Sequence, residues 1–130
     1  IADAIKRYSS QRDRQKGESY VHGFTLAMTC QNMFYRPISE LDNQAGYADI
    51  FLRPLLENYP DMEHSYIVEL KYCKADATDE QVAKLREAAI AQVNRYADSD
   101  VVKTEVKTTH LHKIVVIFRS VDMVVCEEIE

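Results

Sequence analysis

Three ionisable side chains occur in segments whose composition otherwise favours β-strands. Glu69 and Lys71 lie two residues apart in the run from Tyr66 to Tyr72, and Asp49 interrupts an apolar run earlier in the chain. Because side chains alternate between the two faces of a strand, Glu69 and Lys71 project from the same face. Burial of such charges is unfavourable unless they are paired or bind a cation. Two neighbouring carboxylates therefore favour a divalent ion between them, and Mg²⁺, which keeps part of its water shell, suits such a site.

The lysine adds a second chemical function to this pattern. An ammonium group two residues from a metal-binding carboxylate could orient or deprotonate an attacking water molecule. The alternative is that Glu69 and Lys71 form an exposed ion pair on a strand surface and that Asp49 lies in a turn. An Asp followed about twenty residues later by Glu-x-Lys also occurs by chance, so the spacing alone leaves both interpretations open.

Periodicity predicts the elements that must position these residues. Apolar residues recur at helical spacing from Glu18 to Asn32, and segments rich in β-forming residues follow. Thr78 and Gln81 match a capping box, which predicts a helix that runs to about Asp98. The predicted strands span residues 33–41, 46–52, 66–72, 112–119 and 121–129, with a turn at 42–46 and a loop at 53–65. This order, α-β-β-β-α-β-β, predicts an α/β domain with a mixed central β-sheet flanked by helices.

The predicted helix that ends near Asp98 carries two polar side chains on its apolar stripe. Gln92 lies three residues after Ala89 and four before Tyr96, so it falls on the inward-facing line. A buried amide needs hydrogen-bond partners, and Gln92 and Tyr96 could both face the strand that carries Glu69 and Lys71. A core glutamine with satisfied hydrogen bonds beside an interfacial tyrosine explains the pattern equally well.

The first residues of the chain differ in charge from the remainder. Residues 1–16 hold five Lys or Arg and two Asp. We expect residues 1–17 to form a solvated basic helix or the remnant of a linker, with a nucleic-acid contact as the alternative, and residues 18–130 to form the domain. The chain begins at Ile1 within helical sequence, without an initiator Met or a signal peptide, which indicates a piece of a longer protein.

Composition excludes some classes of protein. The net charge of −5 and a pI near 5.4 argue against affinity for nucleic acid based on bulk charge. Cys30, Cys73 and Cys126 are widely spaced and form no CxxC motif, so we expect reduced thiols in a cytoplasmic protein. The longest stretch without Asp, Glu, Lys or Arg, residues 19–35, contains several polar residues and predicts a buried helix, with no span through a membrane.

Other residues with chemical potential have simpler interpretations. His110-x-His112 places two imidazoles on one face of an extended segment, but zinc needs one or two further ligands and none has suitable spacing, so we interpret the pair as a surface where a strand begins. His22 follows Glu18 by four residues, which favours a hydrogen bond between them over a metal site. Cys73 has no evident histidine partner for thiol catalysis and is interpreted as a buried thiol.

Taken together, these residues resemble the PD-(D/E)XK nuclease superfamily. The resemblance is closest to the nuclease-like domain at the C-terminus of predicted bacterial AAA-type ATPases, and it covers residues 18–129. Its landmarks, in order, are Glu18-Ser-Tyr-Val-His22, Ser39-Glu40, Gly46-Tyr-Ala-Asp49-Ile, Tyr66-Ile-Val-Glu69-Leu-Lys71-Tyr72 and Gln92-x-x-x-Tyr96. The fold that this resemblance implies is a restriction-endonuclease-like core.

The resemblance also implies a ligand set and a nucleophile. Asp49 and Glu69, with the backbone carbonyl of Leu70, would bind Mg²⁺ or Mn²⁺. Lys71 would position the attacking water and stabilise charge at the phosphate. Glu18 would add a carboxylate near the metal or its water.

Three more residues have roles by the same resemblance. Gln92 and Tyr96 would orient the site or contact the phosphate backbone. Glu40 would assist them or pair with a neighbouring base.

The implied function is Mg²⁺-dependent hydrolysis of phosphodiester bonds in nucleic acid, DNA in preference to RNA. The parent chain would carry an N-terminal ATPase domain, and two copies could pair as a homodimer. Ala48 replaces the proline of the family name, and Tyr47 stands where relatives often have Arg. These departures and the acidic charge leave an alternative open, a catalytically silent nuclease-like module that binds or regulates the ATPase. A third interpretation is a purely structural network of surface charges.

Overall fold

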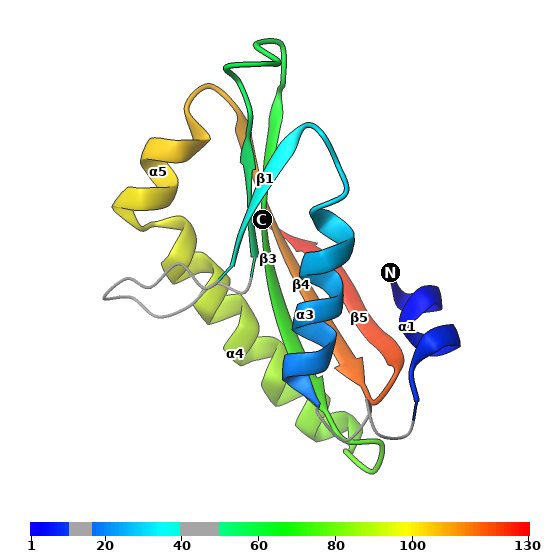
Figure 1. The fold of residues 1–130 in the computed structure, drawn as a ribbon. Coiled ribbons are helices and arrows are strands. Elements are labelled where there is room, and N and C mark those ends of the chain that lie inside the picture. Colours follow the sequence, from blue (N-terminus) through cyan, green and yellow to red (C-terminus); the bar gives the residue numbers. More distant parts are fainter. Residues whose placement is uncertain (11–16, 40–49) are drawn as a thin grey trace.

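A central sheet organises the computed structural model, which describes residues 1–10, 17–39 and 50–130. These residues form a sheet of five strands in the order β1-β2-β3-β4-β5, with helices on both sides (Figure 1). The strands are β1 (Tyr35–Ser39), β2 (Ile50–Pro54), β3 (His64–Cys73), β4 (His110–Arg119) and β5 (Asp122–Ile129). The helices are α1 (Ala2–Tyr8), α3 (Glu18–Thr29), α4 (Asp79–Ala97) and α5 (Asp100–Val106).

The sheet is mixed because one of its strand pairs is parallel. β3 and β4 run parallel in continuous register from His64 opposite His110 to Cys73 opposite Arg119. The pairs β1–β2, β2–β3 and β4–β5 are antiparallel. A parallel pair requires a long crossover, which α4 and α5 supply between β3 and β4. The predicted α/β class with a mixed central sheet is therefore confirmed.

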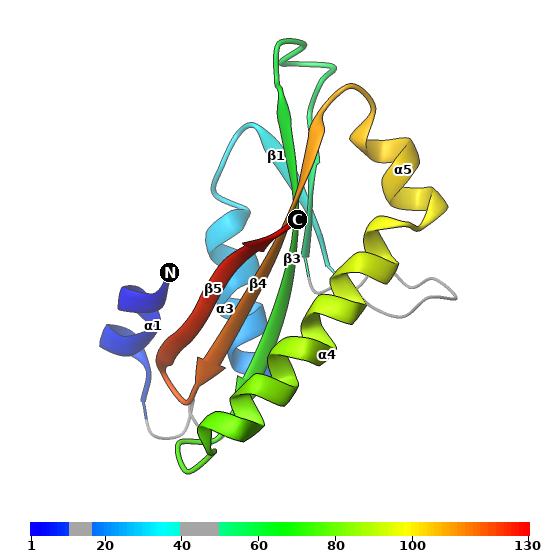
Figure 2. The same cartoon turned by 180° about the vertical axis from the view of Figure 1, so that it is seen from behind.

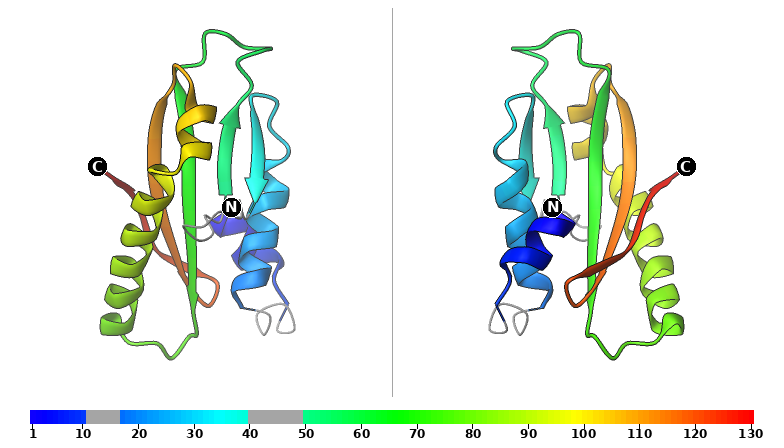
Figure 3. Two further views of the ribbon diagram at one scale, coloured as in Figure 1. Left: turned by 90° about the vertical axis from the view of Figure 1, so that its left-hand side faces the viewer. Right: turned by 90° about the vertical axis from the view of Figure 1, so that its right-hand side faces the viewer.

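Each face of the sheet is covered by its own helices. Helices α1 and α3 lie on one face, hereafter the α3 face, and α4 and α5 lie on the other, hereafter the α4 face (Figure 3). Figure 2 shows α4 running along β3 and β4. Alternation along β4 sends Val115 and Ile117 into the cluster on the α4 face, and Val116 and Phe118 into the cluster on the α3 face. Burial on both sides explains why residues 114–118 form a nearly continuous apolar run.

The sequence predictions of the main elements hold, with shifted ends. The helix predicted at 18–32 ends at Thr29, and the capping box at Thr78 is formed in both directions with Gln81. β2 extends to Pro54 and β3 already begins at His64, so the predicted loop at 53–65 is shorter. The predicted turn at 42–46 lies outside the described residues.

Helix α5 is absent from the predicted order, and the sequence predicts α1 only as a solvated basic helix or a linker remnant. Helix α5 begins after Ser99, whose hydroxyl accepts a hydrogen bond from the amide of Val102, and Val102 is fully buried on the α4 face. Helix α1 packs beside β5, and its Ile5 is fully buried in the cluster on the α3 face. The basic segment at the start of the chain therefore contributes an apolar side chain to the core.

No helix among the described residues has the length and apolar character needed to cross a membrane.

The burial of Ile5 leads to a prediction about stability. Ile5→Ala should lower the free energy of unfolding by about 2–5 kcal/mol, because it opens a cavity between α1 and the sheet. Tyr8→Ala in the same helix is the control, since Tyr8 is 70% exposed. Urea unfolding followed by circular dichroism measures both changes. Equal stability of the two variants would show that α1 is a solvated appendage.

Candidate active site

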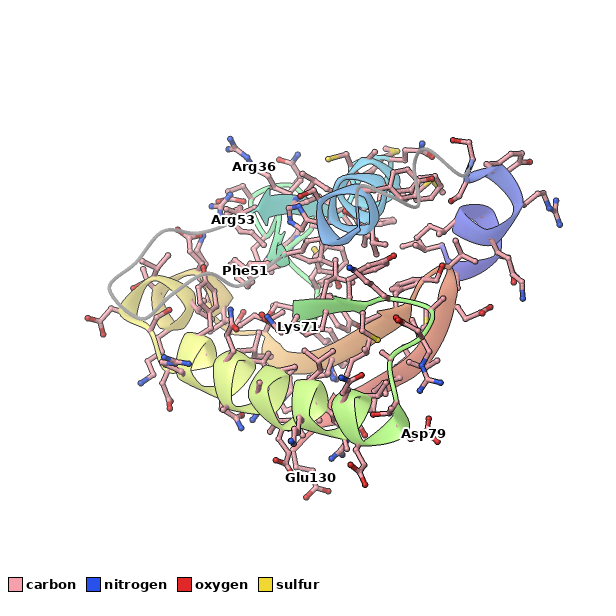
Figure 4. The ribbon with its side chains drawn as sticks, turned by 90° about the horizontal axis from the view of Figure 1, so that it is seen from below. Arg36, Phe51, Arg53, Lys71, Asp79 and Glu130 are labelled. Atoms are coloured by element: carbon pink, nitrogen blue, oxygen red, sulfur yellow. The ribbon has the colours of Figure 1, made fainter. Side chains whose placement is uncertain are left out.

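An ion pair lies at the centre of the sheet, on the middle strand β3. The Nζ atom of Lys71 is 2.8 Å from Oε1 of Glu69, whose side chain is fully buried, and 17% of the Lys71 side chain is exposed. Both side chains point to the α4 face, as alternation predicts, and Figure 4 shows Lys71 on the side of β3 toward that helix. The alternative that Glu69 belongs to an exposed ion pair on a strand surface is therefore excluded.

Helix α4 supplies a polar partner for this pair. The Nζ atom of Lys71 donates a hydrogen bond of 3.2 Å to Oε1 of Gln92. Gln92 occurs between the buried residues Ala89 and Tyr96 on the stripe of α4 that covers the sheet. The ammonium is thus held from two elements, because a carboxylate on its own strand and an amide on the helix both accept from it.

Tyr96 lies one turn beyond Gln92 and is almost completely buried. Its side chain is 1% exposed and packs in the cluster on the α4 face with Phe51, Ile67 and Val93. Burial raises the pKa of the Tyr96 hydroxyl to about 12. Tyr96 therefore carries its proton at neutral pH and offers a neutral hydroxyl.

Leu70 separates the two charged residues and anchors their strand. Its side chain is 2% exposed and packs on the α3 face with Ile50 and Val116. In the parallel ladder Leu70 lies opposite Val116, between the pairs formed by Glu69 with Val115 and Lys71 with Ile117. This packing fixes the register that turns Glu69 and Lys71 toward α4.

Some predicted site residues lie outside what the structure describes. Asp49 and Glu40 belong to the range 40–49, and of Glu18 only the backbone, at the start of α3, is described. Ile50, the next residue after Asp49, pairs with Val68, the residue before Glu69. The structure thus brings together Glu69, Lys71 and Gln92 and places Tyr96 one turn further along α4, and the catalytic roles of all these residues stay predictions.

A pocket opens where β3 leads into α4. Its volume is about 600 Å³. It is lined by Cys73, Lys74, Asp76, Ala77, Thr78, Gln81, Lys84 and Leu85. Cys73 lies two residues after Lys71 and faces the same side of β3, so the pocket lies on the face of the sheet toward which the pair points.

The pocket adds two residues that sequence reasoning missed. Lys74 and Lys84 line it together with Asp76, so its wall carries two positive charges and one negative charge, and neither lysine belongs to a motif. The sequence feature that could have indicated Lys74 is its position directly after the strand that carries Lys71. Cys73 was interpreted as a buried thiol, but it is half-buried, because the pocket exposes it on one side, and its Sγ contacts the carbonyl of Phe118 at 3.6 Å.

Comparison with known protein families gives a match over most of the chain. A family model of the PD-(D/E)XK nuclease superfamily matches residues 16–128. The chain belongs to this superfamily. Its mixed sheet with helices on both faces is consistent with the restriction-endonuclease-like fold, and Glu69-Leu70-Lys71 fits the (D/E)XK part of the superfamily name. Nucleases of the superfamily typically use divalent metal ions. No curated protein and no solved structure gives a significant match to the chain.

The ion pair leads to a prediction about coupled charges. Lys71→Met should lower the free energy of unfolding by about 3–5 kcal/mol, because it removes the ammonium beside the buried carboxylate of Glu69. The double variant Glu69→Gln/Lys71→Met should recover part of this loss, since it removes both charges.

Chemical denaturation at neutral pH measures this coupling. Lys103→Met is the control, because Lys103 forms an exposed ion pair with Asp98. Its expected effect is within about 0.5 kcal/mol. If Lys71→Met also lowered the free energy of unfolding by only about 0.5 kcal/mol, the coupling between Glu69 and Lys71 would be contradicted.

The buried hydroxyl of Tyr96 leads to a prediction at alkaline pH. The unfolded chain releases this proton near pH ~10 and the folded chain near pH ~12, so the free energy of unfolding should fall as pH rises through this interval. In an ultraviolet titration of tyrosinate, Tyr96→Phe should remove the component that titrates last, and Tyr8→Phe should leave it in place. An unchanged last component in Tyr96→Phe would refute the assignment.

Proposed function

We propose that the chain is a nuclease domain that hydrolyses phosphodiester bonds of nucleic acid, with DNA preferred over RNA and Mg²⁺ or Mn²⁺ as cofactor. The observation that carries the proposal is the fully buried carboxylate of Glu69 with the ammonium of Lys71 2.8 Å away, in a chain of the PD-(D/E)XK nuclease superfamily. Such a pair adds little net stability compared with apolar residues of similar size. A chemical role is the better explanation for its position at the centre of a sheet.

The donor atoms of the site suit a hard divalent cation. Glu69 offers carboxylate oxygens, and Mg²⁺ binds through one or two carboxylates while it keeps several waters. Asp49 is the proposed second carboxylate, supported by its place in the chain directly before Ile50, the partner of Val68. The backbone carbonyl of Leu70 and the carboxylate of Glu18 complete the proposed oxygen set. When bound, the ion supplies positive charge that stabilises the developing negative charge on the phosphate.

The chain's own residues then have distinct tasks. Lys71 orients the attacking water with its Nζ atom and offsets the negative charge of Glu69. Gln92 restrains that ammonium through its hydrogen bond to Nζ. Tyr96, protonated at neutral pH, contributes a neutral donor or acceptor near the site and cannot serve as a base there.

Substrate contact requires local positive charge, because the chain as a whole carries a net charge of −5. Lys74 and Lys84 in the wall of the neighbouring pocket supply it. Phosphate contacts by these lysines position the backbone of a nucleic acid without reading its sequence. An attached N-terminal ATPase and a pairing of two copies remain part of the proposal.

Cleavage assays with matched variants test this function. The intact chain is incubated with labelled single-stranded DNA, duplex DNA and RNA in the presence of millimolar Mg²⁺ or Mn²⁺. Asp49→Asn, Glu69→Gln and Lys71→Met should each lower the cleavage rate at least about a hundredfold. Glu87→Gln, an exposed carboxylate on the outer side of α4, should leave the rate unchanged.

Metal binding separates the proposal from its alternative. Isothermal titration with Mn²⁺ should give saturable binding that Asp49→Asn and Glu69→Gln weaken. Saturable binding without cleavage of any of the three substrates would favour the silent nuclease-like module. Cleavage that persists in both carboxylate variants would contradict the proposed site.

A further inference from the structure

Three of the four histidines of the chain gather at one end of the sheet, on the α3 face. His64 begins β3 and lies opposite His110, which begins β4, and His112 lies two residues further along β4, opposite Tyr66. Glu128 of β5 reaches the same group from the other side of β4. At this level of the sheet β3 and β4 extend beyond α3 (Figures 1 and 3), and His64 and His110 are exposed.

His112 is the centre of this group. Its Nδ1 lies 2.5 Å from Oε1 of Glu128, and its Nε2 lies 2.9 Å from Nδ1 of His64. Its ring stacks on that of Tyr66 with 4.9 Å between centroids and 19° between planes. Only 18% of its side chain is exposed. His112 is therefore held in place by its strand, by a neighbouring ring and by contacts at both ring nitrogens.

The ligand atoms of the group converge. One nitrogen each of His110 and His112 and a carboxylate oxygen of Glu128 all lie within 4.8 Å of one another. In a tetrahedral site with bonds of about 2.0–2.1 Å, ligand atoms are separated by about 3.4 Å. Rotation of the exposed side chains of His110 and Glu128 can shorten these separations to the tetrahedral value, whereas His112 is held in place.

Either a proton or a metal ion can occupy the contact between Nδ1 of His112 and Glu128. A carboxylate oxygen and the lone pair of an imidazole nitrogen approach this closely only with a proton or a metal ion between them. If Nε2 donates its hydrogen to Nδ1 of His64, the lone pair of His112 is at Nδ1 and faces Glu128. Such a hydrogen bond at the second nitrogen of a metal-binding histidine fixes its tautomer and orientation.

From this arrangement we propose a second metal site, in which His110, His112 and Glu128 bind a transition-metal ion of the Zn²⁺ type. His64 is the positioning residue that holds the tautomer of His112. Two imidazoles and one carboxylate form a donor set that zinc accepts, with the fourth position open to water. The ion takes the place of the proton between His112 and Glu128 and joins β4 to β5.

This site is separate from the candidate active site. His112 faces the α3 side of the sheet, whereas Glu69 and Lys71 face α4. The two sites also differ in ligand chemistry, because Mg²⁺ prefers oxygen ligands and imidazole favours Zn²⁺ and its neighbours in the transition series. Zn²⁺ affinity should therefore survive changes at Glu69 and an excess of Mg²⁺.

Titration of the intact chain with Zn²⁺, followed by isothermal calorimetry in excess Mg²⁺, tests the proposal. One ion should bind per chain, and His110→Gln and His112→Gln should each weaken binding at least about tenfold. Three controls should leave the affinity unchanged. His22→Gln removes the remaining histidine, Glu69→Gln alters the candidate active site, and Cys126→Ser removes an exposed thiol on β5.

A second measurement covers the case in which His112→Gln disturbs the fold. Zn²⁺ should raise the melting temperature of the wild type, because it binds only the folded chain, and this rise should be lost in His110→Gln and Glu128→Gln, both at exposed positions. The absence of saturable Zn²⁺ binding would overturn the proposal. Equal affinity in the wild type and the two histidine variants, or loss of binding in Glu69→Gln, would also overturn it.

Discussion

The burial of one carboxylate between a sheet and a helix is the constraint on which the site depends. Glu69 is fully buried on the middle strand, and the ammonium of Lys71 lies 2.8 Å away. Desolvation of two such charges offsets most of their mutual attraction, so the pair does not hold the fold together. The apolar clusters on both faces of the sheet supply that stability and keep β3 rigid enough to hold the two charges in place.

The parallel pairing of β3 and β4 explains how two neighbouring strands can carry two proposed sites. Both strands are central enough to be covered on two faces along much of their length, but α3 does not extend to their starts. The covered part turns Glu69 and Lys71 toward α4, and the uncovered part presents His64, His110 and His112 on the α3 face. Because side chains alternate along a strand, the Glu69–Lys71 pair and the histidines lie on opposite faces of the sheet.

The orientations of Glu69, Lys71 and Gln92 could be predicted because the sequence patterns that determine them span only a few residues. The spacing of Glu69 and Lys71 predicts one face, the capping box at Thr78 predicts the start of α4, and the apolar stripe directs Gln92 inward; the structure agrees in each case. Contacts between distant segments were not predictable. Helix α5 is only seven residues long and is stabilised by burial of Val102, and the cluster around His112 depends on strand register. The burial of Ile5, which lies in a basic segment, was not predictable either, because it results from packing against distant segments.

The two proposed sites favour different metal ions because their donor atoms differ. Carboxylate and carbonyl oxygens at the proposed nuclease centre suit a hard ion that retains water, and the imidazoles at the opposite face suit an ion that binds nitrogen. Affinity of N and O donors for zinc generally exceeds that for most divalent ions, and the proposed histidine site on β4 and β5 should therefore fill with zinc before the oxygen site on β3 does. On this argument zinc up to one equivalent occupies the histidine cluster and leaves the proposed nuclease centre to the hard ion.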